Sequence, residues 1–337
     1  MKSFNKILQV LAIAAFTVSL TSCNDDDDNA IMPPETNTIA DIVSNSDDFD
    51  ILLAAAVKAD LVATLSTTVN TDLTVFAPTD AAFITYLGAA DETAAITTVN
   101  SLSSDVVANL LLNHVLGTSV TASQITAGYV KALSTNADGD NLDLYVGVAN
   151  GTVTINGISD VTTLDVAADN GVIHVVDAVI PEATIATFAS ADPNFSTLLA
   201  AVVQEDLAAT LSGAGTFTVF APTNDAFQVL IDADPNDGIT SAADILALGD
   251  SDTTTTSALD NILRHHVLGA TVRAEDLSTT APTPATPLFA GGGLSIDATV
   301  TPPSITDGSG ATYDIVVTNV TGTNGVVHAI TGVLMPE

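Results

Sequence analysis

The sequence predicts an α+β protein built from two copies of one domain. Two observations carry this expectation. Each half of the chain runs from helical periodicity to alternating, strand-like patterns, and an ordered set of motifs occurs once in each half. The period of about 150 residues is too long for a solenoid and matches a duplicated domain. The 337 residues, 47% of them hydrophobic, suffice for two cores of ordinary size.

The repeated motifs keep their order while their spacing drifts, so loop lengths differ between the halves. The central motif, Thr74–Phe83, returns as Thr218–Phe227. The flanking pairs are Phe49–Ala55 with Phe195–Ala201, Asn113–Gly117 with His265–Gly269, and Asn170–His174 with Asn324–His328.

Together these motifs resemble the fasciclin (FAS1) domain, with the two domains at residues 38–181 and 184–337. The resemblance implies that each domain is a β-sandwich wedge with packed helices. It also implies non-catalytic work in adhesion, which is an analogy from fold and motif. In animal fasciclin domains a Tyr-His pair beside the His-Val-Leu segment is associated with receptor adhesion. Here the Tyr position holds Asn113 or His265, which puts receptor binding through this pair in doubt.

The first 22 residues have the pattern of an export signal. Lys2 and Lys6 precede a short apolar segment, residues 7–20, that is too short for a spanning helix. Residues 20–23 then resemble a bacterial lipobox, in which the cysteine receives lipid. Cys23 is the only cysteine, so no intramolecular disulfide can form. We therefore expect a lipid anchor at Cys23; the alternative is an ordinary secretory leader followed by an incidental cysteine.

Residues 23–37 form an expected acidic, disordered tether. The run Asp25–Asp28 is typical of a solvated segment. It also resembles the acidic signal that Bacteroidetes-type lipoproteins use to reach the outer face of the outer membrane. We therefore expect an outer-membrane lipoprotein exposed on the cell surface, although a plain hydrophilic tether would have the same composition.

Each domain is expected to open with a helix and to continue through a strand-to-helix corner. Apolar residues from Phe49 to Leu61 follow the spacing of one buried helical stripe. A short strand then stops at Ala-Pro, after which Thr79 and Thr223 are expected N-caps. Asp80 and Asp225 follow in the first turn, where negative charge favours the helix dipole. We interpret this corner as a folding element.

A later helix and several strands complete each predicted domain. The apolar positions between 106 and 115 place His114 on a buried helix face, and His266 occupies the same place in the second copy. His174 and His328 lie in strands that are apolar on both faces, which is typical of a covered strand. Hairpin turns are expected at Asn150-Gly151, Asn170-Gly171 and Asn324-Gly325.

All five histidines lie in the repeated motifs, which raises the alternatives of a metal site or a catalytic site. A zinc or catalytic site needs convergent ligands with an open position. The histidines have no His-x-x-x-His spacing, and no Gly-x-Ser-x-Gly or phosphate-loop motif occurs. We therefore expect buried, hydrogen-bonded structural histidines at positions 114, 174, 266 and 328, and a protein that is not an enzyme.

The charge is strongly acidic, with 40 Asp and Glu against 6 Lys and Arg, for a net charge of −34. Such a chain repels nucleic acid and attracts divalent cations. Asp232, Asp234 and Asp237 form a weak calcium candidate because oxygen ligands alternate before a glycine. However, Asp237 and Ala243 stand where a calcium loop needs Gly and Glu, so a polar turn is an equal explanation. No other cofactor is expected.

The expected function is that of a lipid-anchored surface protein that adheres to cells, matrix or polysaccharide. Contact with the membrane is expected only through the lipid. The alternative is a lipoprotein of an uptake system that captures a glycan or a small ligand. A solvent-open apolar pocket with a few polar groups would favour the alternative.

Overall fold

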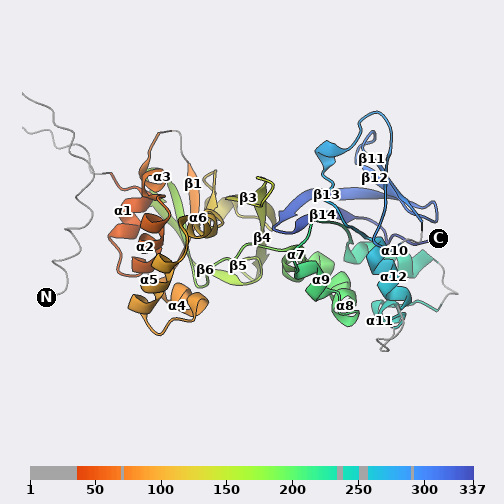
Figure 1. Cartoon of the computed structure of the whole chain (residues 1–337), viewed down its shortest axis with the longest axis horizontal. Helices are drawn as coiled ribbons and strands as arrows, with labels where there is room; N and C mark the ends of the chain where they lie inside the picture. The colour runs from red at the N-terminus through yellow and green to blue at the C-terminus, as the bar shows by residue number, and fades with distance from the viewer. Residues whose placement is uncertain (1–35, 70–71, 234–237, 250–256, 290–291) are drawn as a thin grey trace, which may run out of the picture. The chain divides into compact units, whose positions relative to one another are not determined.

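The computed structural model describes residues 36–69, 72–233, 238–249, 257–289 and 292–337 (Figure 1). The leader, Cys23 and the acidic tether lie outside the described residues. Residues 36–337 form one compact unit. Among the described residues no single helix has the length and apolar composition of a membrane span; α5 and α6 meet that test only as a pair, bent by 114° at their junction.

The first domain places most of its helices before its strands. Its helices are α1 (Ile39–Ser44), α2 (Asp50–Lys58), α3 (Val62–Ser66), α4 (Asp80–Leu87), α5 (Glu92–Ser101), α6 (Ser104–Leu112) and the short 3-10 helix η1 (Ala122–Gln124). Its strands are β1 (Leu73–Pro78), β2 (Val115–Leu116), β3 (Gly128–Thr135), β4 (Asn141–Ala149), β5 (Thr152–Ile155), β6 (Ser159–Ala168) and β7 (Gly171–Val176).

The second domain repeats this order of elements. Its helices are α7 (Ile185–Ala191), η2 (Pro193–Phe195), α8 (Ser196–Gln204), α9 (Ala208–Ser212), α10 (Asn224–Ala233), α11 (Ala242–Leu246), α12 (Ala258–His265) and η3 (Ala274–Asp276). Its strands are β8 (Phe217–Pro222), β9 (Val267–Leu268), β10 (Thr283–Ala285), β11 (Leu294–Asp297), β12 (Ser304–Thr306), β13 (Thr312–Gly322) and β14 (Gly325–Ile330). The α+β class and the duplication predicted from the sequence are therefore confirmed.

The helices begin at the caps that the sequence predicts. The Thr79 hydroxyl accepts a hydrogen bond from the Ala82 amide at 3.3 Å, and the Thr223 hydroxyl accepts one from Ala226 at 3.2 Å. The helix expected to open the first domain is its second helix, α2, and its buried face is only partly the predicted stripe. Phe49, Leu52 and Ala56 are buried as expected, but Val57 is 61% exposed. Ile51 and Ala55, which the periodicity did not place on the stripe, are buried instead.

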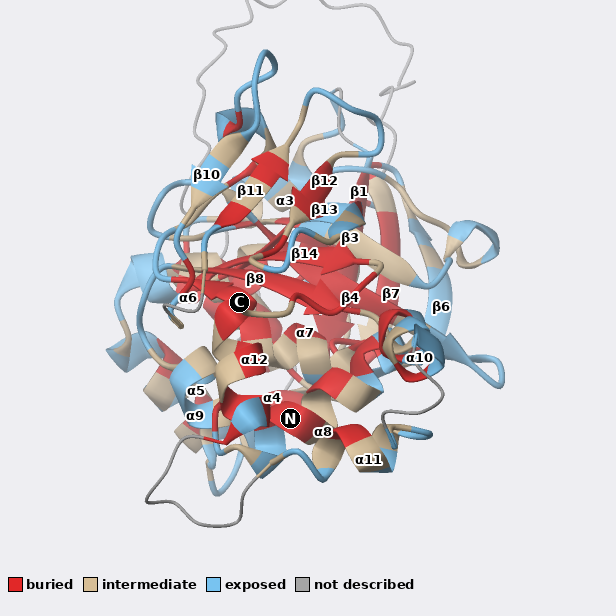
Figure 2. Ribbon diagram, turned by 90° about the vertical axis from the view of Figure 1, so that its right-hand side faces the viewer, coloured by how far each residue is buried: buried red, intermediate tan, exposed pale blue. Residues whose placement is uncertain are grey.

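Each domain has one seven-stranded sheet, and the first and last strands of the domain pair in parallel. In the first domain β1 pairs with β7, and the seven strands close into a barrel. In the second domain β8 pairs with β14, and the sheet runs from β10 to β9. Strands β1 and β14 are buried along their whole length (Figure 2). Each domain has two apolar clusters, one between the helices and the sheet and one among the strands.

Two of the three predicted hairpin turns lie one residue earlier than the Asn-Gly pattern indicated. Asn150 and Gly151 form the loop between β4 and β5, as expected, with φ of 53° and 84°. In contrast, Ala168 pairs with Gly171, so the second loop is formed by residues 169 and 170. The third hairpin is offset in the same way, because Gly322 pairs with Gly325. The prediction of these two turns was wrong in register because the glycine is needed inside the strand.

The reason for that glycine is the close approach of the neighbouring parallel strand. Gly171 has φ of 152°, and a Cβ atom at this position would lie 2.1 Å from the carbonyl oxygen of Leu73. Gly325 repeats the arrangement, with 2.0 Å to the carbonyl oxygen of Phe217. Only glycine allows the first and last strands to meet at this point.

Gly171→Ala is expected to lower the free energy of unfolding by more than about 3 kcal/mol, because the new methyl group meets backbone rather than a movable side chain. Gly139→Ala is the matched control: Gly139 also has a positive φ, of 88°, but nothing lies within 4 Å of its Cβ position. The control is expected to lose about 1 kcal/mol. Urea unfolding of both variants measures the difference, and equal losses would show that the contact with Leu73 is not limiting.

Candidate functional site

His114 and His266 each join the end of a helix to the last segment of their domain. His114 Nδ1 donates to the Leu110 carbonyl at 2.8 Å, and its Nε2 accepts the Ile180 amide at 2.8 Å. His266 makes the same two contacts with Ile262 and Leu334, both at 2.8 Å. Both rings are buried, and both ring nitrogens are occupied by backbone groups.

His174 and His328 hold a different pair of segments together. His174 Nε2 donates to the Val120 carbonyl at 2.8 Å, and its Nδ1 accepts the Asp165 amide at 3.2 Å. His328 repeats this with Val272 at 2.9 Å and Asn319 at 3.2 Å. The acceptor roles of Nδ1 require the tautomer protonated at Nε2. These two histidines therefore tie a bulged strand to the loop after the short strand β2 or β9.

Burial favours the neutral form of His114, His266 and His328. Desolvation lowers the pKa of His114 and of His266 to about 4, and the backbone hydrogen bonds from the rings only partly oppose that effect. Desolvation also lowers the pKa of His328. Since backbone groups occupy both nitrogens of each of the four rings, none of them offers a free lone pair to a metal ion or to a substrate.

The position associated with a Tyr-His pair is closed to solvent in both domains. Asn113 is fully buried; its amide donates to the carbonyls of Ile180 and Pro181, and its oxygen accepts the Ser134 hydroxyl at 2.8 Å. His265 is also fully buried, and among the described residues its ring nitrogens meet no hydrogen-bond partner. Neither side chain can contact a partner molecule without a rearrangement of the domain.

Two asparagines that the sequence reading took only as turn formers are central to the fold. Asn170 donates from its amide to the carbonyls of Leu65 and Thr67, at 2.8 and 3.0 Å, and accepts the Ile39 amide at 2.9 Å. Asn324 does the same in the second domain with residues 211, 213 and 185. Each asparagine thus joins the last hairpin to the first and third helices. The identical motif in both halves was the available signal.

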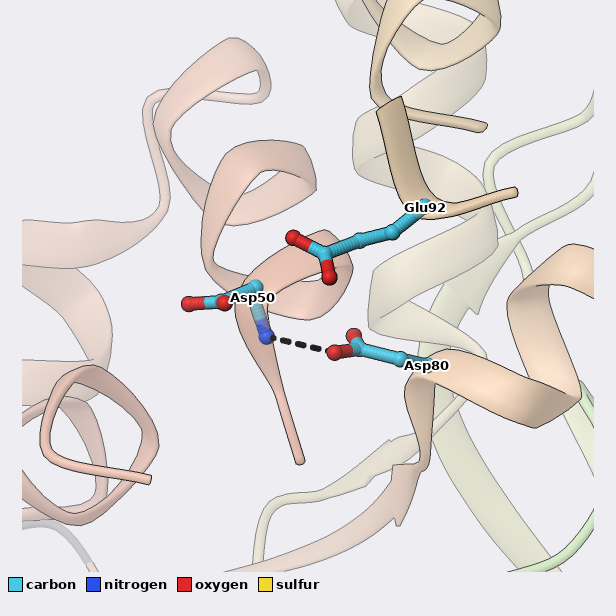
Figure 3. Close-up of side chains that lie close together, drawn as sticks. All are labelled: Asp50, Asp80 and Glu92. Atoms are coloured by element: carbon cyan, nitrogen blue, oxygen red, sulfur yellow. Dashed lines mark hydrogen bonds between the residues drawn. The ribbon is translucent and has the colours of Figure 1, made fainter. Parts of the chain in front are cut away.

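Asp80, the first residue of α4, binds the N-terminus of the second helix, α2. Its Oδ2 accepts the Asp50 amide at 3.3 Å (Figure 3). Its Oδ1 accepts the Ile51 amide at 2.8 Å, and the two bonds cap α2 from outside. In the second domain Asn224 has this role, accepting the Thr197 amide at 3.0 Å. Asp225 lies in the first turn of α10, as the sequence indicated.

Asp50, Asp80 and Glu92 bring one carboxylate oxygen each within 4.8 Å of one another. Desolvation by burial raises the pKa of Asp80, and the charges of Asp50 and Asp48 raise it further, while the two backbone hydrogen bonds oppose the shift.

The expected calcium loop is only partly described. The Asp232 carboxylate accepts a hydrogen bond from the Gln228 amide at 3.0 Å, and Asp234 and Asp237 lie outside the described residues. Calcium binding at that loop stays a prediction.

Two of the basic residues lie where the two repeats meet. Lys131 donates to Oδ2 of Asp143 at 2.6 Å, and the Thr321 amide donates to the same oxygen, also at 2.6 Å. Arg273 pairs with Asp140 and donates to the Thr321 hydroxyl at 3.2 Å. Burial raises the pKa of Asp143, and the hydrogen bonds from Lys131 and Thr321 act against that rise. Lys131 also donates to the Thr321 hydroxyl at 3.2 Å, so Thr321 bonds to both cations and to an acid of the first repeat.

Aromatic side chains also pack at the junction between the two domains. Tyr129 donates to the Asp192 carboxylate at 2.9 Å, and its ring meets Phe188 edge-on at a centroid distance of 5.6 Å. Tyr145, 5.2 Å from Tyr129, is buried in the core of the second domain. The sequence reading gave no indication of this contact, because it joins residues that lie far apart in the chain.

These arrangements define a protein of two tandem domains whose repeated motif residues stabilise the fold. The family comparison agrees with this description. The fasciclin domain model matches residues 47–182 and 193–336, so the chain belongs to the fasciclin domain family.

The chain spans only part of the length of the curated relatives that it matches. The chain is 33% identical over 197 residues to the pig (Sus scrofa) transforming growth factor-beta-induced protein ig-h3, which is 57% of this chain and 27% of that protein. It is 32% identical over 125 residues to human periostin, 36% of this chain and 14% of that one. A FAS1 domain pair from the insect cell adhesion molecule Fasciclin I has 19% sequence identity and a TM-score of 0.48, covering 85% of this chain and 96% of that one.

His114→Leu is expected to destabilise the first domain at pH 7, because the Leu110 carbonyl and the Ile180 amide lose their partner at about 1–3 kcal/mol each. The difference in the free energy of unfolding between the variant and the unchanged protein should shrink as the pH falls from 6.5 to about 4. The folded-state pKa lies below the unfolded value of 6.5, so the unfolded chain binds the proton first and the histidine's contribution disappears over this range. The shrinkage should reach about 3 kcal/mol.

Urea unfolding at pH 7, 5.5 and 4 measures this gap, and groups that titrate in both proteins cancel in the difference. A gap that stays constant over the three pH values would contradict the buried neutral state of His114.

Proposed function

We propose that this protein is a lipid-anchored adhesion protein of the bacterial outer membrane, exposed on the cell surface, that binds neighbouring cells, matrix or surface polysaccharide without catalysis. The observation that carries the proposal is the pair of fasciclin domains, because adhesion is the work that membership of this family implies by analogy of fold and motif. The lipobox-like residues 20–23 and the acidic run after them support the anchor and the surface location.

The charge of the domains limits the kind of partner. Residues 36–337 contain four basic side chains, and each makes an intramolecular bond. Lys131 and Arg273 lie at the domain junction, Arg264 pairs with Asp260, and Lys58 donates to the Asn100 carbonyl at 3.1 Å. The surface therefore presents mainly carboxylates and neutral groups. A neutral glycan or a basic protein segment suits this surface, and a polyanion such as nucleic acid does not.

Cys23 is expected to carry lipid at its sulfur, because it ends a short leader and has no disulfide partner in the chain. Mass spectrometry of the mature N-terminus tests this directly. Cys23→Ser is the control, and it should move the protein from the membrane fraction to the soluble fraction. An unmodified Cys23, or a leader cut elsewhere, would refute the anchor.

Binding is tested with the soluble Cys23→Ser protein on arrays of neutral glycans, anionic glycans and matrix proteins at physiological salt. We expect saturable binding to neutral glycans or basic matrix segments and none to sulfated polyanions. Cells that lack the protein should attach less well to the same surface, and re-expression should restore attachment. No binding to any class together with unchanged attachment would remove the adhesion proposal. Protease treatment of intact cells tests the surface location separately.

A further inference from the structure

The second domain contains an apolar pocket with a cavity volume of about 60 Å³. It lies between the helices α7, α8, α9 and α12 and the strands β8, β9 and β14, and we call it the α7–α9 pocket. Figure 1 draws α7, α8 and α9 as neighbours. Most of the lining is aliphatic. The lining also includes exposed or partly exposed residues, namely Thr210, Leu288 and Arg264, so the pocket reaches solvent on that side.

The first domain provides a matched comparison, because its corresponding pocket has a volume of only about 30 Å³. The positions can be equated through shared contacts: Thr38 and Thr184 cap the first helices of their domains, and Asn170 and Asn324 bond the carbonyls of Leu65 and Leu211.

With this equivalence, the walls of the two pockets differ in side-chain size. Val43, which lines the first-domain pocket, corresponds to Ala189 in the lining of the α7–α9 pocket. Ala208, also in that lining, corresponds to Val62, which packs against the apolar cluster of the first domain. Both positions are therefore smaller around the α7–α9 pocket. At one position the second domain has the larger side chain, because Val202 corresponds to Ala56 of the first domain. The larger volume is therefore a local feature of the α7 and α9 walls.

The mouth of the α7–α9 pocket carries a charge that the first domain lacks. Arg264 lines it, where the first domain has Leu112. The Nε atom of Arg264 donates to both oxygens of Asp260, at 2.8 and 2.7 Å, and the side chain is 42% exposed. Among the described residues Nη1 and Nη2 have no hydrogen-bond partner. His266 also lines the pocket, but the backbone groups of Ile262 and Leu334 occupy its two nitrogens.

An aliphatic cavity beside a guanidinium edge fits a molecule with an apolar chain and an anionic oxygen head. We propose that the α7–α9 pocket binds a short-chain aliphatic carboxylate, with the chain in the cavity and the carboxylate on Nη1 and Nη2 of Arg264. About 10–15 Å³ of such volume accepts one water-sized group. A volume of about 60 Å³ therefore takes a chain of about four to six heavy atoms. Neither a protonated amine head nor a pure hydrocarbon has a lone pair that could accept the N–H groups of Nη1 and Nη2, whereas a carboxylate accepts both.

This site is separate from the adhesion proposed above and does not depend on it. The test uses the soluble full chain and follows methyl resonances of Leu288 and Val327 by NMR during titration with hexanoate, 1-hexanol and acetate. We expect saturable shifts with hexanoate, at least tenfold weaker binding of hexanol, and no saturable shifts with acetate, which has no chain to fill the cavity.

The first domain supplies the residues for the variants. Ala189→Val with Ala208→Val should weaken hexanoate binding at least tenfold while the melting temperature stays the same or rises, because the cavity is filled. Should the double variant not fold, Ala208→Val alone gives the same readout. Arg264→Leu should weaken hexanoate at least tenfold and change hexanol less than twofold.

Two results would overturn the proposal. One is the absence of saturable shifts with hexanoate, or hexanoate binding that the valine variants leave unchanged. The other is hexanol binding as tight as hexanoate with no effect of Arg264→Leu, which would leave an apolar cavity without a carboxylate site.

Discussion

The parallel pairing of the first and last strands is the contact on which each domain depends. Strand β1 meets β7 from Leu73 with Gly171 to Pro78 with Val176, so the first and last strands of the domain lie side by side. The pairing requires a backbone approach that only glycine allows at position 171. It also brings Asn170 beside the ends of α1 and α3, where its side chain satisfies three backbone groups. The histidine contacts then fix the segments on either side of this strand pair.

Such a contact joins residues about 100 positions apart, and this separation limits what the sequence alone could predict. The caps at Thr79 and Thr223 were predictable because their cause acts within one helical turn. The α2 helix was predictable too, but its buried face was only partly so, because the packing of neighbouring elements decides that Ile51 is buried and Val57 is exposed. The buried state of His114 followed from its place on an apolar helix face. Its partner, the Ile180 amide, did not, because no local pattern indicates which distant backbone group will lie beside a ring.

The asparagines explain the error in the hairpin register. Asn followed by Gly is the strongest short signal for a two-residue turn, and at Asn150 it has that meaning. At Asn170 the same two letters serve other needs: the side chain reaches back to α1 and α3, and the glycine lies inside the strand against Leu73. The difference lies in what packs against the pair, which is a property of the fold and not of the dipeptide. The domain junction was equally hidden, because Lys131 meets Thr321 and Arg273 meets Asp140 across the two domains, between residues far apart in the sequence.

Comparison of the two repeats separates what the fold requires from what each domain can change. The glycine, the asparagine and the two structural histidines are the same in both, since each makes the same backbone contacts twice. Asp80 and Asn224 differ in charge, but each accepts a backbone amide at the N-terminus of α2 or α8 with a side-chain oxygen. Only the oxygen acceptor is therefore required at this position. The residues that line the pockets differ more between the two repeats than these cap residues do. At about 24 cal/mol per Å³, the extra volume of the α7–α9 pocket costs about 1 kcal/mol, which is small against a typical domain stability of about 5–15 kcal/mol. A fold fixed by a few backbone contacts can therefore keep an open cavity in one copy and a smaller one in the other, and the difference between them is where new binding can arise without loss of the domain.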